Sequence, residues 1–180
     1  MKKSFIFPFI PWPFALGVIA FVLTLSADQI SKYWILYDID LPAHGSIRVL
    51  PFLNFTMVWN RAITFGMFGW LGHSGRFIFS GISLAVVCAL LVWMYRTPYK
   101  LTALCIGTIA GGAIGNVIDR LRYGAVVDFL HAHAFGWSWY VFNVADSAIV
   151  CSVCILLVQN FLSSHQQVLQ ESVECSVSDE

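Results

Sequence analysis

Four long runs of apolar residues, separated by shorter polar stretches, organise the chain. They cover approximately Pro13–Ile35, Arg76–Tyr95, Leu101–Ile118 and Val141–Leu162. A helix needs roughly 20 residues to cross a hydrocarbon core of about 30 Å. The third run is the shortest and is rich in glycine, which suits close helix packing in lipid. The pattern therefore predicts four transmembrane helices.

The overall composition agrees with this prediction. Of the 180 residues, 58% are hydrophobic and only 11% are charged, and the mean hydropathy is +0.75. A soluble domain cannot bury so much apolar surface, so we expect an integral membrane protein. The formal net charge is zero and no basic stripe with interleaved aromatics is present, which argues against nucleic acid as a partner.

The longest connection between the apolar runs extends from Tyr37 to Gly75. Residues around Ser46–Trp59 alternate in a pattern typical of β-strands, which predicts a small strand pair lying on the membrane. The predicted fold is an all-α polytopic membrane protein with four transmembrane helices and a small extracytoplasmic β-element between helices 1 and 2. Residues 1–162 form one transmembrane domain, and the polar tail, residues 163–180, is expected to be cytoplasmic and disordered.

The positions of the basic residues predict the orientation. A raw count of Lys and Arg does not favour either choice, but the N-terminal Lys2-Lys3 and the short link Arg96–Lys100 are compact positive flanks. Such flanks stay in the cytoplasm, so both termini are expected there. The first apolar run is longer than a signal-peptide core and lacks a convincing cleavage site, so we interpret it as an uncleaved span.

With this topology, the polar residues of three helices and one connection converge at the outer leaflet. Ionisable groups at membrane depth are costly, so they usually mark a functional site. The converging residues are Asp28 and Lys32 on the first helix, Asn116, Asp119 and Arg120 on the third, Asp128 in the third connection, and Asn143 and Asp146 on the fourth helix.

Helical spacing groups several of these residues. Asn116, Asp119 and Arg120 stand at i, i+3 and i+4 and so share one helix face. An arginine next to Asp119 favours a structural role for that carboxylate. Asp28 and Lys32 stand at i, i+4 in the order that favours pairing, and either an interfacial ion pair or a functional role fits them.

Asp128 and Asp146 have no adjacent cation in the sequence, which makes them the better candidates for chemistry. Two carboxylates in a low-dielectric site do not both ionise easily, so one holds a proton while the other acts as a base. Such a pair can activate water and protonate a leaving amine without a metal or cofactor. Peptide-bond hydrolysis at the membrane surface is the function that this pair favours.

Two alternatives use the same region. Asp128, His131 and His133, with His73 as a further candidate, could ligate zinc, but no HExxH pattern is present, so we expect no metal. A small proton-coupled transporter could use the carboxylates as a relay. That function predicts acids at successive depths, whereas the acids of this chain cluster in one leaflet.

Four segments resemble the motifs of bacterial lipoprotein signal peptidase, also called signal peptidase II. They are DQISK (28–32), NRAITFG (60–66), GGAIGNVIDRLRYGAVVDF (111–129) and FNVADSAI (142–149), in the order of that family. The last two are long and specific. The second departs from the usual family pattern, because Ala62 and Thr64 replace small residues of that motif.

The resemblance implies an intramembrane aspartyl protease of the bacterial inner membrane, with no cofactor and with its active site at the extracytoplasmic leaflet. Its substrates would be prolipoproteins whose lipobox cysteine carries diacylglycerol, cut just before that cysteine. Its partners would be these substrates and membrane lipids, and the enzyme would be a monomer. The catalytic pair corresponds to Asp128 and Asp146. Supporting or substrate-binding residues correspond to Asp28, Lys32, Asn60, Gly66, Asn116, Asp119, Arg120 and Asn143.

Overall fold

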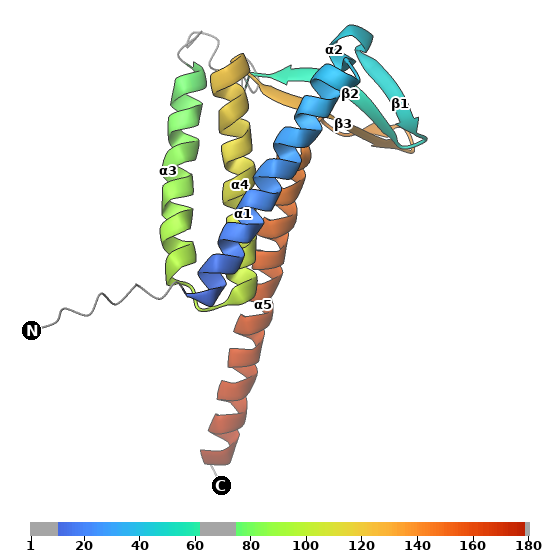
Figure 1. Cartoon of the computed structure of the whole chain (residues 1–180). Coiled ribbons are helices and arrows are strands. Elements are labelled where there is room, and N and C mark those ends of the chain that lie inside the picture. The colour runs from blue at the N-terminus through green and yellow to red at the C-terminus, as the bar shows by residue number, and fades with distance from the viewer. Residues whose placement is uncertain (1–10, 62–74, 179–180) are drawn as a thin grey trace, which may run out of the picture.

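The computed structural model describes residues 11–61 and 75–178, with the side chains of 165–178 left out of the description. Four long helices run side by side (Figure 1): α1 (Trp12–Tyr33), α3 (Gly75–Arg96), α4 (Lys100–Tyr123) and α5 (Val144–Ser178). Within the described residues, each is long and apolar enough to cross a membrane. The prediction of four membrane-spanning helices is confirmed.

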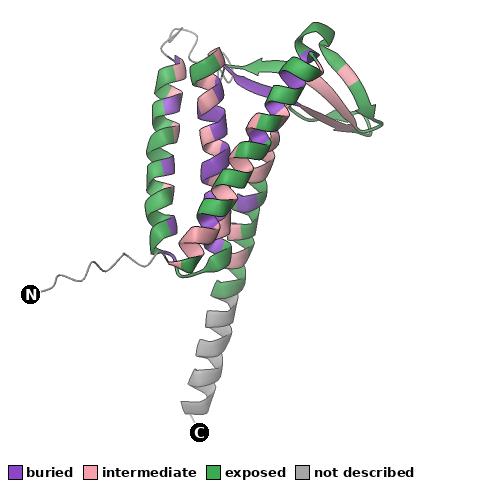
Figure 2. Cartoon of the chain, in the orientation of Figure 1, coloured by how far each residue is buried: buried purple, intermediate pink, exposed green. Residues whose placement is uncertain are grey.

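Helix α4 occupies the centre of the bundle and contacts α1, α3 and α5. Half of its 24 residues are buried. The outward faces of the other three helices carry exposed apolar side chains (Figure 2). In lipid such a surface needs no covering, because the acyl chains are as apolar as the side chains. The other three helices therefore surround α4 and present to the lipid a surface of apolar side chains.

Two glycines of α4 allow α1 to approach its backbone closely. A Cβ atom at Gly107 would overlap the backbone of Gly17, and one at Gly111 would overlap the backbone of Phe21. One turn further on, a Cβ at Gly115 would overlap the carboxylate of Asp28. The glycine-rich third run thus serves helix contact as predicted, and this contact brings the polar end of α1 against α4.

A four-stranded antiparallel sheet covers one end of the bundle. Its order is β1 (Ser46–Leu50), β2 (Leu53–Asn60), β3 (Val126–Ala134) and β4 (Trp137–Ser138). The predicted strand pair is β1 and β2. The β-element is not confined to the connection between the first two long helices, however, because β3 and β4 come from the connection between α4 and α5. Both connections leave the same end of the bundle, so β2 finds its partner in β3.

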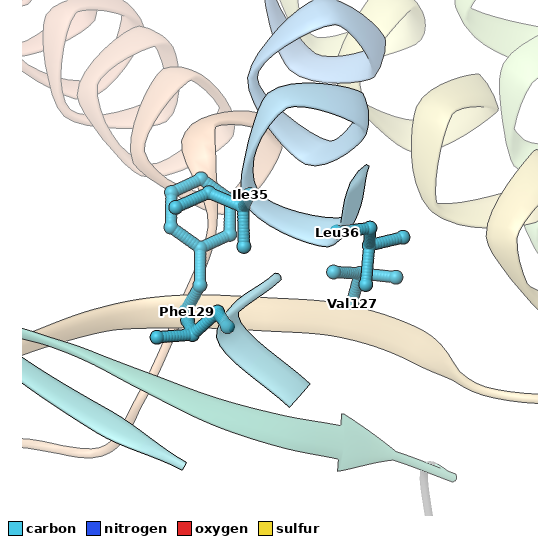
Figure 3. Packing of buried hydrophobic residues seen from close by; sticks show 5 residues of the cluster. Ile35, Leu36, Val127 and Phe129 are labelled. Atoms are coloured by element: carbon cyan, nitrogen blue, oxygen red, sulfur yellow. The ribbon is translucent and has the colours of Figure 1, made fainter. Parts of the chain in front are cut away.

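A compact apolar cluster attaches the sheet to the bundle. After α1, the chain makes a π-helical turn (Trp34–Asp38) and a short helix α2 (Leu41–His44) before it enters β1. Ile35 and Leu36 from the π-helical turn pack with Val127 and Phe129 of β3 (Figure 3). The two strand residues are buried on either side of Asp128 in the sequence, so this cluster fixes the strand segment that carries Asp128.

The helix boundaries differ from the prediction at three places. Helix α4 continues past Ile118 and ends at Tyr123, where Gly124 adopts a positive φ of 78° and closes the helix. Helix α5 begins at Val144, three residues later than the fourth apolar run. It also continues through residues 163–178, which the sequence analysis expects to be disordered. These residues include no glycine or proline, so nothing stops a helix that is already nucleated.

Candidate active site

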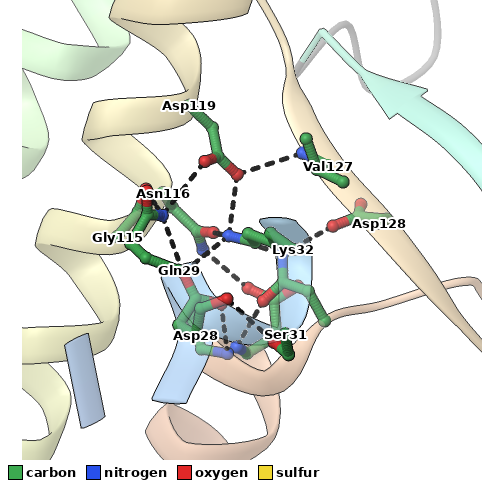
Figure 4. Close-up of polar contacts among 12 residues, drawn as sticks. Asp28, Gln29, Ser31, Lys32, Gly115, Asn116, Asp119, Val127 and Asp128 are labelled. Carbon is green, nitrogen blue, oxygen red and sulfur yellow. Dashed lines mark hydrogen bonds and ion pairs between the residues drawn. The ribbon is translucent and has the colours of Figure 1, made fainter. Parts of the chain in front are cut away.

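A buried lysine binds two carboxylates near the C-terminal end of α1. Lys32 is only 2% exposed. Its Nζ lies 2.8 Å from Asp28 Oδ2, 2.7 Å from Asp119 Oδ2 and 3.0 Å from Asn116 Oδ1 (Figure 4). A lysine ammonium has three N–H donors, and these three contacts use all of them. Lys32 is therefore the centre of a saturated ionic cluster.

The two carboxylates of this cluster also bind backbone groups of other elements. Asp28 Oδ1 accepts the backbone N–H of Ala145 at 3.0 Å, and Asp119 Oδ2 accepts that of Val127 at 3.1 Å. Gln29 Nε2 donates to both side chains, at 3.2 Å each. The cluster thus connects α1, α4, β3 and α5. Sequence reasoning did not single out Gln29, although it stands between the two charged residues of its motif.

These contacts decide two points that the sequence analysis considered. Asp28 and Lys32 form a buried pair rather than an exposed interfacial one. Asp119 pairs with Lys32, so the expectation that Arg120 is its structural partner is wrong. The Arg120 Nη1 group instead donates to the backbone carbonyl of Asn116 at 3.3 Å.

Asn143 lies between the two candidate aspartates. It is the residue just before α5, and its Oδ1 accepts the backbone N–H of Asp146 at 2.9 Å, which is the geometry of a helix N-cap. This contact directs the Asn143 Nδ2 group toward Asp128 Oδ1, at 2.6 Å, and Asn116 Oδ1, at 3.2 Å. Asp146 is therefore in the first turn of α5.

Asn116 completes the connection to Asp146. Its Oδ1 is occupied by Lys32, so its Nδ2 group points the other way and donates to Asp146 Oδ1 at 2.9 Å. The orientation of this amide is set by the lysine, because an ammonium group can only donate. The ionic cluster and the candidate pair are thus linked through one amide side chain.

Asp128 receives amide N–H groups on both carboxylate oxygens. Asn143 Nδ2 donates to Oδ1, and Asn60 Nδ2 of the neighbouring strand donates to Oδ2 at 2.9 Å. The side chain is 1% exposed. Burial raises the pKa of Asp128 from its ordinary value of 3.8 to about 6; the Asp146 carboxylate adds to the increase, while the two amides oppose it. Asp128 therefore changes protonation close to physiological pH.

The structure brings most of the predicted site residues together. Asp28, Lys32, Asn116, Asp119, Asp128, Asn143 and Asp146 form one hydrogen-bonded network with Asn60. Gly66 of the second motif and His73 lie outside the described residues.

One histidine of the alternative zinc site, His131, is engaged elsewhere in the sheet. The two ring nitrogens of His131 lie 3.3 Å from Thr56 Oγ1 and 2.6 Å from Ser138 Oγ. Over residues 11–61 and 75–178, no group of three His, Cys, Asp or Glu side chains is placed to hold a metal ion.

The fold and this network define a polytopic membrane protein with two amide-bound carboxylates, Asp128 buried and Asp146 half-buried, at one end of its helix bundle. Residues 19–162 match the family model described as signal peptidase (SPase) II. The chain is 48% identical over 147 residues to the lipoprotein signal peptidase of Methylorubrum extorquens (strain PA1), covering 82% of this chain and 86% of that protein. It is 44% identical over 154 residues to the lipoprotein signal peptidase of Rhodopseudomonas palustris (strain ATCC BAA-98 / CGA009), covering 83% and 94%.

Solved structures agree. One described as a bacterial membrane enzyme structure obtained by the in meso method is 28% identical and superposes with a TM-score of 0.71, covering 91% of this chain and 93% of that one. A second with the same description reaches a TM-score of 0.69 at 29% identity, covering 88% and 95%. The chain belongs to the signal peptidase II family, and the resemblance read from its motifs is confirmed. It is a multi-pass peptidase of the bacterial inner membrane.

Proposed function

We propose that this protein is an intramembrane aspartyl endopeptidase that removes the signal peptide from prolipoproteins, with Asp128 and Asp146 as the catalytic carboxylates. The observation that carries the proposal is that one side chain, Asn143, contacts both residues: the carboxylate of Asp128 and the backbone of Asp146. This side chain donates to Asp128 and accepts the backbone N–H of Asp146. Within the described residues, neither aspartate forms an ion pair, so both are free to exchange protons.

The contacts support a separate role for each aspartate. Asp128 accepts two amide N–H groups, which favour its ionised form, and its raised pKa makes it a stronger base than an ordinary carboxylate. A general base works best when its pKa is close to the working pH. Asp128 is therefore the base that takes a proton from the attacking water. In this assignment Asp146 is the general acid, which supplies a proton to the substrate.

Each proton has a destination in this scheme. The water oxygen bonds to the scissile carbonyl carbon while Asp128 takes a water proton, and Asp146 donates its proton to the carbonyl oxygen. The resulting tetrahedral diol collapses as the carbon–nitrogen bond breaks. Asp128 then protonates the leaving amine, and Asp146 recovers its proton from the diol hydroxyl. Both carboxyls return to their starting states, and the pair titrates as a unit.

The substrate we propose carries diacylglycerol on the lipobox cysteine and is cut on the N-terminal side of that cysteine. The lipid chains can stay in the bilayer, because the exposed apolar faces of the helices border lipid close to the site. Burial of acyl chains contributes about 0.8 kcal/mol per CH₂ group, so lipid supplies much of the binding.

The position of the pair supports an extracytoplasmic active site. The pair lies at the sheet-bearing end of the bundle, opposite the α3–α4 link that contains Arg96 and Lys100 (Figure 1). Short positive links remain in the cytoplasm. The orientation we propose therefore has the site at the outer leaflet and both termini inside.

The test is cleavage of a diacylglyceryl-modified prolipopeptide by the purified full-length chain in detergent, with a chelator present. We expect wild type to cut before the lipidated cysteine, and Asp128→Asn and Asp146→Asn to be inactive while their melting curves stay like that of wild type. Activity that survives either substitution would disprove the aspartyl pair. Activity lost on chelation alone would return the zinc site to consideration.

A further inference from the structure

The turn between β3 and β4 exposes an unusual number of aromatic side chains. Four of the six residues 135–140 are aromatic. Their exposed fractions are 105% for Phe135, 84% for Trp137, 72% for Trp139 and 84% for Tyr140. Large apolar groups that are exposed together mark an interaction surface or a membrane contact. We call these four residues the aromatic turn.

Phe135 occupies a backbone position that does not suit it. Ala134 pairs with Trp137 across a two-residue turn, and both turn residues have positive φ, 50° at Phe135 and 82° at Gly136. Such turns favour Asn or Asp followed by Gly, because bulky side chains are strained at positive φ. A strained phenylalanine whose ring is fully exposed does nothing for the packing of the described residues. Its ring therefore points to a contact outside the chain.

The chemistry around the aromatic turn favours lipid as that contact. Residues 132–142 include no Asp, Glu, Lys or Arg. The turn between β1 and β2 adjoins it, since the His133 backbone N–H donates to the Phe52 carbonyl at 3.0 Å. That turn adds the exposed side chains of Leu50 and Phe52. Trp and Tyr gather at membrane–water interfaces because one end of each ring system is apolar and the other is polar.

The position of the aromatic turn leads to the same conclusion. Tyr140 precedes the first residue of the membrane-spanning α5 by only four positions. The far end of the sheet lies to the side of α1, at the level of its upper turns rather than beyond the end of the bundle (Figure 1). A turn at this level is beside the bilayer when the four helices span it.

We propose that the aromatic turn inserts into the outer surface of the bilayer and anchors the sheet there. Strand β3 carries the aromatic turn at one end and Asp128 within its buried half, so the anchor holds Asp128 at a constant depth relative to the lipid. The anchor itself is independent of the proposed function. Only the effect of the anchor on cleavage rests on the proposed function.

The first experiment measures depth by fluorescence quenching in vesicles of phosphatidylglycerol and phosphatidylcholine with brominated acyl chains. The full-length chain keeps only Trp137, with the other tryptophans changed to Phe. A chain that keeps only Trp93 of α3 is the control within a span. We expect Trp137 to be quenched most by lipids brominated near the headgroup and to be shielded from aqueous iodide. Quenching by iodide without quenching by lipid would overturn the anchor, and so would protection from both, which would indicate contact between copies of the chain.

The second experiment uses Phe135→Asn, which suits the turn better than the native residue. We expect the variant to melt in detergent at the wild-type temperature or higher, yet to show weaker lipid quenching at Trp137 and several-fold slower cleavage of lipidated substrate in vesicles. Cleavage of a short lipopeptide in micelles should not change. The matched control is Tyr99→Asn, which removes an exposed aromatic at the other end of the bundle. Unchanged quenching and unchanged cleavage in vesicles for Phe135→Asn would contradict the proposal.

Discussion

Four aspartates lie in one buried network, yet they divide into two groups with different partners. Asp28 and Asp119 each contact the Lys32 ammonium and a backbone N–H. In the part of the chain that the structure describes, Asp128 and Asp146 bind N–H groups of amides and no cation. The difference shows how one residue type serves two purposes in the same low-dielectric region.

The partner decides the purpose. A carboxylate beside an ammonium group is held in place by an ion pair, which favours its charged form. Such a pair can hold helices together. The hydrogen bonds to the carboxylates of Asp128 and Asp146 come from amide side chains instead, and burial raises the pKa of Asp128. We therefore assign the Lys32 group to structure and the amide-bound pair to chemistry.

The largest effect is expected when one carboxylate of the amide-bound pair is neutralised. Asp128→Asn or Asp146→Asn should lower kcat/KM by about 10⁴-fold or more, as expected for groups that act as a unit in the transition state. The measurement is single-turnover cleavage of lipidated prolipopeptide. Asp38→Asn, at an exposed carboxylate beyond the ionic cluster, is the matched control and should retain full activity.

The complementary substitution removes the cation. Lys32→Met leaves two buried carboxylates without their partner, which should cost about 3–5 kcal/mol of stability. The measurement is thermal unfolding in detergent. Lys100→Met, at an exposed lysine, should change stability by no more than about 0.5 kcal/mol.

A triple variant separates charge from packing in this cluster. Adding Asp28→Asn and Asp119→Asn to Lys32→Met removes all three charges, so it should recover part of the lost stability. If the triple variant is no more stable than Lys32→Met alone, the cluster is not held by charge pairing and the distinction between the two groups fails.

The pH dependence sharpens the role of Asp128. Because its pKa is raised to about 6, kcat/KM should fall by about tenfold per pH unit below roughly pH 6, as the base becomes protonated. The stability of the folded protein changes with pH in the opposite direction to the activity. The folded protein holds this proton more tightly than the unfolded chain, so the contribution of Asp128 to stability is present at low pH and is lost as the pH rises through about 6. Activity that stays constant down to pH 4.5 would exclude Asp128 as the base.

The smallest expected effect concerns a single amide. The Asn60 side chain lowers the pKa of Asp128 through its hydrogen bond to Oδ2. Asn60→Ala should therefore move the acidic limb of the pH profile upward by about one unit, since one such bond contributes about 1–2 kcal/mol. Asn54→Ala on the same strand is the control and should leave the limb in place. A limb that moves equally in both variants would point to a general change in the sheet.

Much of the site could be predicted because its residues stand at helical spacing. Asn116 and Asp119 lie one turn apart, and so do Asp28 and Lys32, so local geometry alone puts each pair on one face. The ion pair between helices was harder to predict from the sequence. Arg120 follows Asp119 directly in the sequence, but consecutive helical residues point in different directions, so Lys32 from α1 becomes the partner instead.

Contacts that depend on where the backbone elements begin and pair also could not be predicted from the sequence. The N-cap geometry of Asn143 depends on where α5 begins, and helix boundaries cannot be read from hydropathy to within a few residues. The contact of Asn60 with Asp128 depends on β2 pairing with β3 across 68 positions of sequence. The alternating pattern of a β-strand does not indicate which other strand it pairs with.

Hydropathy, glycine spacing and four motifs were sufficient to identify the membrane-spanning helices, the family and the residues that share the site. Such features are local: the bilayer sets the length of each span, and helical repeat sets which residues share a face. The division of the four aspartates into two groups emerged only from the folded chain. A carboxylate's role depends on which donor lies within about 3 Å of it, and packing between distant segments alone decides that.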